Sequence, residues 1–183
     1  AWNTASNSAS ETASVLAAGC PVIVKAHNSH PGTAQLAAQV IVQAAEETGM
    51  PAGVFSILFG RGSAIGQDLA QHPGIAAIAF TGSRSGGTSL MATAAARRIP
   101  IPVYAEMSSL NPVVFLAGAL AGEIDTDALA RELVGSLTLG SGQFCTNPGL
   151  IFVPKGNDEF IGSISRAVRD QAGQTMLSSS IRE

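Results

Sequence analysis

A glycine-rich segment, Gly140–Gly149, contains one of the two cysteines of this 183-residue chain, Cys145. It lies between a predicted helix that ends near Leu139 and a predicted strand that begins at Leu150. A thiol in such a bend is accessible, and the backbone N–H groups beside it can point at a developing oxyanion. A nucleophilic cysteine requires this arrangement.

A candidate base lies upstream of this cysteine. Glu106 follows the apolar run 101–105 and precedes the segment Met107–Pro112. A carboxylate at the end of a strand can accept a proton in catalysis. The alternative interpretation is a buried core cysteine and a solvated glutamate, but Cys145 lies among glycines rather than in an apolar run. For Cys20, at the entrance to a predicted strand, a structural role is the better interpretation.

The composition excludes several classes of function. The chain is 46% hydrophobic and 13% charged, which predicts faces covered by a parallel core or an oligomer interface. The net charge of −3 without a basic cluster argues against a nucleic-acid partner. We find no apolar run long enough to span a membrane and no signal-peptide pattern. Two cysteines suit a reducing cytoplasm, and the three histidines lack zinc-ligand spacing.

Apolar runs typical of buried strands alternate with segments of helical periodicity in the first half of the chain. We expect strands at 21–25, 54–58, 75–80 and around 103, and helices at 8–19, 33–47, 63–71 and 90–97. This order predicts a parallel sheet with helices on both faces. Ligands bind such sheets at the carboxyl ends of the strands. These ends should form one rim carrying Lys25, Gly60, Thr81 and Glu106.

The pattern changes after Glu106, where we place a domain boundary. Strands are expected at 112–116 and 150–153. Helices should begin at Asp125 or Thr126 and at Asn157 or Asp158. The dipeptide Asn111-Pro112 favours a turn with a structural role. No repeat is found, and the segment after Met176 has no predicted element.

Four segments in this order resemble the aldehyde dehydrogenase superfamily, namely Val22–Lys25, Phe80–Ser83, Glu106–Pro112 and Gly142–Cys145. Each is weak alone, but four in order are specific. Four further stretches are similar to the 2,5-dioxovalerate, or α-ketoglutarate semialdehyde, dehydrogenases, namely Ala17–Pro21, Lys25–Thr33, Tyr104–Ser109 and Gly135–Gly149. Bacterial NADP-linked fatty aldehyde dehydrogenases are similar in the same places.

The resemblance implies a fragment of a longer enzyme that is a cytoplasmic dimer or tetramer. Residues 1–105 would be part of a Rossmann-like dinucleotide-binding domain. Residues 106–183 would be the first part of a second α/β catalytic domain. Cys145 would attack the aldehyde, hydride would leave to the nicotinamide, and Glu106 would activate the water that hydrolyses the resulting thioester.

The resemblance also implies a cofactor site. Lys25 would bind the adenosine ribose and any attached phosphate, although a solvated lysine is the alternative. His27 and His30 lie near this site, but we interpret them as surface histidines. The pyrophosphate would lie on Thr81, Gly82 and Ser83 at a helix N-terminus, although an ordinary serine cap is the alternative. The sequence lacks GxGxxG, as the family does.

NAD-preferring relatives carry a glutamate where this chain has Asn28. Without that glutamate, the site lacks the negative charge that would repel a 2′-phosphate. Arg61 could bind that phosphate, or could be a plain exposed arginine. We therefore expect NADP, or NAD, as the cofactor. Asn3 superficially matches the family's oxyanion asparagine, but a surface role fits its spacing better.

Three functions stay open at this point. The first is oxidation of a small aldehyde, 2,5-dioxovalerate, to a carboxylate. The second is the same chemistry on long-chain aldehydes. The third is a truncated, non-catalytic nucleotide-binding fragment.

Overall fold

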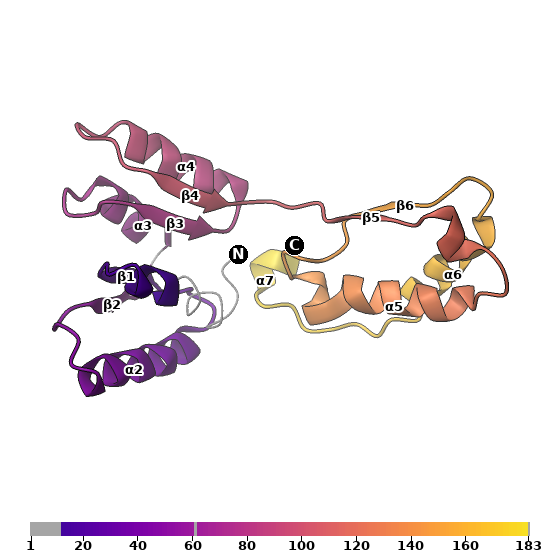
Figure 1. Cartoon of the computed structure of the whole chain (residues 1–183), viewed down its shortest axis with the longest axis horizontal. Helices are drawn as coiled ribbons and strands as arrows, with labels where there is room; N and C mark the ends of the chain where they lie inside the picture. The colour runs from indigo at the N-terminus through magenta and orange to yellow at the C-terminus, as the bar shows by residue number, and fades with distance from the viewer. Residues whose placement is uncertain (1–11, 61, 183) are drawn as a thin grey trace. The chain divides into compact units, whose positions relative to one another are not determined.

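The computed structural model describes residues 12–60 and 62–182 (Figure 1). Its chain divides into two compact units, the first ending at Ser108 and the second beginning at Ser109. Both units are built from pairs of parallel strands with helices between them. The α/β class and the parallel strands expected from the sequence are therefore confirmed.

The first unit repeats a strand–helix pattern. After a helix over 12–17, its elements are β1 (Val22–Lys25), α2 (Pro31–Glu47), β2 (Phe55–Leu58), α3 (Gly62–Gln71), β3 (Ile78–Thr81), α4 (Arg84–Ala95) and β4 (Val103–Glu106). β1 pairs with β2, and β3 pairs with β4. α2 packs against β2, α3 against α4 and β1, and α4 against β4.

The prediction that all four strands of this unit form one sheet with a common rim is wrong for the described residues. Backbone hydrogen bonds join the strands only in pairs, so Lys25 and Gly60 lie at the end of one pair. Thr81 and Glu106 lie at the end of another, opposite each other in register. Two-stranded ribbons bury little apolar surface by themselves. Accordingly, Ile23 on β1 is 45% exposed.

Local chemistry explains where two elements begin. α2 starts at Pro31, two residues earlier than predicted, because the fixed φ of proline suits the first helical turn. β3 starts at Ile78 rather than at Ile75. The backbone groups of Ile75 are engaged outside the sheet, since its N–H donates to the carbonyl of His72 and its carbonyl accepts from the Arg97 guanidinium at 3.0 Å.

The second unit packs two helices beside one strand pair. Its elements are β5 (Pro112–Val114), η1 (Ala117–Leu120), α5 (Thr126–Thr138), η2 (Leu139–Gly142), β6 (Leu150–Phe152), α6 (Asp158–Arg169) and α7 (Ser179–Arg182). β5 and β6 pair in parallel, and α5 packs on α6. Asp125 caps α5 by accepting the Ala128 N–H at 2.9 Å, as the sequence predicts. The short elements η1, η2 and α7 were not predicted.

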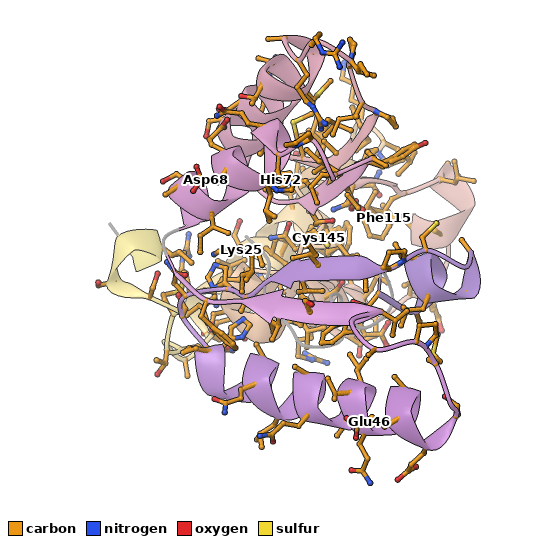
Figure 2. All side chains as sticks on the ribbon, turned by 90° about the vertical axis from the view of Figure 1, so that its left-hand side faces the viewer. Lys25, Glu46, Asp68, His72, Phe115 and Cys145 are labelled. Atoms are coloured by element: carbon orange, nitrogen blue, oxygen red, sulfur yellow. The ribbon has the colours of Figure 1, made fainter. Side chains whose placement is uncertain are left out.

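The core of the second unit lies between α5 and α6. Val134 and Phe160 are almost completely buried there, with Ala130 and Ala167 beside them. The ring of Phe115 (Figure 2) meets that of Phe160 edge to face, with centroids 4.8 Å apart. Across residues 12–60 and 62–182, no helix is both long and apolar enough to cross a membrane.

We expect Phe160→Ala to lower the free energy of unfolding by about 3–5 kcal/mol, because it empties the centre of this core. Val168, on the same helix, is 45% exposed. We expect Val168→Ala to change that free energy by no more than about 0.5 kcal/mol. Urea unfolding followed by circular dichroism measures both. Equal effects of the two substitutions would contradict the assignment of the core.

Candidate functional site

The Cys145 thiol, labelled in Figure 2, is exposed, and its residue lies in a tight turn. The Asn147 N–H donates to the carbonyl of Phe144 at 3.2 Å, which makes Cys145 the second residue of a four-residue turn. Among the described residues, the backbone N–H of Cys145 takes part in no hydrogen bond. That N–H is therefore available to an oxyanion formed beside the sulfur.

Side-chain amides hold the glycine-rich backbone that precedes this turn. Gly140 and Ser141 have left-handed conformations, at φ 58° and 61°. Gln143 donates from Nε2 to the carbonyl of Gly140 at 2.8 Å, and Asn147 donates from Nδ2 to that of Gly142 at 2.9 Å. The loop is thus ordered by its own polar side chains.

A second segment, Ser109–Asn111, holds the turn from the other side. The Asn111 amide donates to the carbonyls of Cys145 and Asn147, at 2.6 and 2.9 Å. The Ser109 hydroxyl donates to the same Cys145 carbonyl. Sequence reasoning assigned Asn111 to a turn and missed these contacts. The available signal was two polar side chains just before the strand at Pro112.

The ends of β3 and β4 bring four predicted site residues together. Thr81 is the register partner of Glu106, and the Gly82 N–H donates to the Glu106 carbonyl at 3.0 Å. The Glu106 side chain is exposed. Ser83 caps α4 by accepting the Gly86 N–H on its hydroxyl at 3.2 Å. The structure therefore shows the serine cap. The Ser83 hydroxyl also lies 3.3 Å from that of Ser85, at a helix N-terminus that suits an anion.

A cluster of polar side chains follows β1. The Lys25 ammonium (Figure 2) donates to Oδ1 of Asn28 at 3.2 Å, and burial lowers the pKa of Lys25. The rings of His27 and His30 stack with centroids 5.2 Å apart. Nδ1 of His27 accepts the Ser29 N–H at 3.1 Å. Burial, followed by the charges of His30 and Lys25, lowers the pKa of His27.

The cluster has unused hydrogen-bonding capacity. Both ring nitrogens of His30 are buried and find no partner within the described part of the chain. Buried polar atoms without partners are uncommon and indicate a missing group. Together with the Lys25 ammonium, they fit a ribose that carries hydroxyl or phosphate oxygens.

Two residues considered from the sequence, Arg61 and Asn3, lie outside the described residues. In the described ranges, no group of three or more His, Cys, Asp or Glu side chains is placed to hold a metal ion.

Comparison with known proteins places these features in a family. The sequence pattern of the "Aldehyde dehydrogenase family" matches residues 1–178. "Alpha-ketoglutaric semialdehyde dehydrogenase 2" of Azospirillum brasilense is 53% identical over 175 residues, covering 94% of this chain and 33% of that protein. The "Alpha-ketoglutaric semialdehyde dehydrogenase" of Acinetobacter baylyi is 42% identical over 174 residues, covering 94% of this chain and 32% of that protein.

A solved structure agrees with these sequence matches. The "NAD-dependent aldehyde dehydrogenase from Sinorhizobium meliloti" superposes with a TM-score of 0.68 at 31% identity, covering 82% of this chain and 28% of that one. The chain spans about a third of the length of the curated relatives it matches. The family pattern covers nearly the whole chain, and this chain therefore belongs to the aldehyde dehydrogenase family.

Proposed function

We propose that the protein to which this chain belongs oxidises an aldehyde to a carboxylate with NAD(P), and that its substrate is α-ketoglutarate semialdehyde. The observation that carries the chemistry is the exposed Cys145 thiol in a hydrogen-bonded turn. The substrate rests on two relatives with that name, 53% and 42% identical over 94% of the chain.

The proposal assigns the bond-making and proton-transfer steps to Cys145 and Glu106, with a nicotinamide as hydride acceptor. The Cys145 thiol releases its proton to solvent, its sulfur forms a C–S bond to the aldehyde carbon, and the Cys145 N–H binds the resulting oxyanion. The hydrogen on that carbon then leaves as hydride, so a thioester remains on the sulfur. Glu106 accepts a proton from water as the water attacks this thioester. The C–S bond breaks, the acid leaves, and the thiol is restored. A nicotinamide cofactor, when bound, supplies the hydride acceptor.

The polar cluster after β1 and the N-terminus of α4 support a dinucleotide site. Lys25, His27 and Asn28 would surround the adenosine ribose, and Thr81, Gly82 and Ser83 would face the pyrophosphate. Asn28 brings no negative charge to the ribose. An arriving phosphate would raise the pKa of His27 again, because an anion favours the imidazolium. We therefore favour NADP, with Arg61 as a further contact.

The same proposal assigns the parts of the chain. Residues 1–105 would belong to the dinucleotide-binding domain, and residues 106–183 would begin the catalytic domain. The whole enzyme would be a homo-oligomer of the cytoplasm. Two free, exposed cysteines, Cys20 and Cys145, suit a reducing compartment.

We expect Cys145→Ser to lower NADPH formation on 2,5-dioxovalerate by at least about a thousandfold, because a serine hydroxyl without its own base is a poor nucleophile. Cys20→Ser is the matched control, since Cys20 is also a free, exposed thiol. It should keep full activity. The assay uses the full-length enzyme. Turnover by the Cys145→Ser variant comparable with that of the unsubstituted enzyme would refute the assignment of Cys145 as the nucleophile.

We expect Asn28→Glu to raise the KM for NADP by about 10- to 100-fold while leaving the KM for NAD similar, because the added carboxylate repels the 2′-phosphate. Asn28→Gln adds the same length without charge and should leave both constants nearly unchanged. Steady-state kinetics with both cofactors measure the effect. An equal loss in both variants would show that Asn28 acts through its shape rather than its lack of charge.

A further inference from the structure

The Asn111 side chain holds two points of the turn that carries the thiol. Its Nδ2 lies 2.6 Å from the carbonyl oxygen of Cys145 and 2.9 Å from that of Asn147. The amide nitrogen has two protons, and these two carbonyls are its shortest contacts. Its third contact is with the Ser109 hydroxyl at 3.3 Å. One side chain thus holds the backbone at both Cys145 and Asn147.

The backbone around Asn111 is locked to the same turn. The Ser109 hydroxyl donates to the Cys145 carbonyl, which therefore accepts from two side chains. The Gly149 N–H donates to the Leu110 carbonyl at 2.9 Å. A Cβ at Gly149 would lie 2.8 Å from that carbonyl oxygen, so only glycine allows the two segments to approach this closely.

The backbone conformation of Asn111 suits glycine better, which indicates that the side-chain amide is needed at this position. Its φ is 43°, in the left-handed region where glycine is most comfortable. Asparagine tolerates this region better than most residues. The side chain adds what glycine lacks, the two N–H donors that reach the turn. The requirement for those donors explains why an amide stands at this position.

We propose that Asn111 is a positioning residue for the reaction at Cys145, an inference that rests on the proposed function. Holding the Cys145 carbonyl fixes the peptide plane between Cys145 and Thr146, and with it the direction of the thiol and of the Cys145 N–H. Attack on a carbonyl carbon depends steeply on this geometry, since a misplacement of about 1 Å can cost about a hundredfold in rate.

The test uses two substitutions in the full-length enzyme. Asn111→Gly keeps the left-handed backbone and removes the donors, whereas Asn111→Asp keeps the shape and places acceptors against two carbonyl oxygens. We expect each to lower the single-turnover rate of NADPH formation by about 10- to 100-fold. The KM for NADP should be unchanged. Iodoacetamide should still label Cys145 at the original rate, because an exposed thiol needs no fixed approach.

Asn157 offers a matched control in the same unit. Its amide donates to a single backbone carbonyl, that of Pro154, at 2.9 Å. Asn157→Ala removes a comparable hydrogen bond and should leave the single-turnover rate unchanged. An equal loss of rate in Asn157→Ala and Asn111→Gly would overturn the proposal, since a general loss of stability would then explain both. An original rate in Asn111→Gly would overturn it directly.

A second measurement does not depend on turnover. Hydrogen exchange in the unliganded protein should be faster over 143–149 in both Asn111 variants, and unaltered there in Asn157→Ala. Faster exchange with an unchanged single-turnover rate would overturn the positioning role. Absence of aldehyde oxidation by the unsubstituted enzyme would refute the proposed function instead. If the enzyme does not oxidise aldehydes, unaltered hydrogen exchange over 143–149 in the Asn111 variants would still show that the Asn111 amide does not hold the turn.

Discussion

The parallel pairing of β5 with β6 determines the environment of the thiol. Pro112 and Leu150 are register partners at the starts of these strands. Parallel strands enter a sheet from the same end, so the segments that precede them must lie side by side. One of these segments ends at Asn111, and the other contains Cys145. Their hydrogen bonds follow from this pairing, and the core of α5 and α6 supports it.

The same geometric rule organises the first unit at the opposite ends of its strands. The pairing of β3 with β4 places the backbone of Gly82 against that of Glu106. The carboxyl end of β1 leads towards α2, and Lys25, His27 and His30 lie at that end and in the segment before the helix. In each case the residues proposed for binding or catalysis lie at the ends of short paired strands, as Lys25 and Glu106 do, or in the segments beside them.

Much of this arrangement could be predicted from the sequence, because its signals are local. Asp125, one of the two caps expected for its helix, does cap it, and the apolar runs form parallel strands. Ser83 caps α4, which was only the alternative to a pyrophosphate contact. The order of the four family-like segments was also enough to identify the family, which the comparisons confirm.

The failures have long-range causes. The late start of β3 depends on Arg97, which is 22 positions from the carbonyl it binds. The hydrogen bonds of the Asn111 amide reach Cys145 and Asn147, which are 34 and 36 positions away in the sequence. No local sequence pattern indicates such contacts, so the sequence predicted only a turn at Asn111. One parallel sheet was expected from the alternation of strands and helices, but the described strands pair only in twos.

The chemistry proposed here requires a covalent thioester on Cys145 that Glu106 helps to hydrolyse. The most direct measurement is peptide mass spectrometry of the full-length Glu106→Gln variant, quenched in acid after mixing with NADP and 2,5-dioxovalerate. We expect the Cys145 peptide to gain the mass of the aldehyde less two hydrogens, in an amount that matches the NADPH formed. Formation of NADPH with no adduct on Cys145, or an adduct on Cys20 instead, would contradict it.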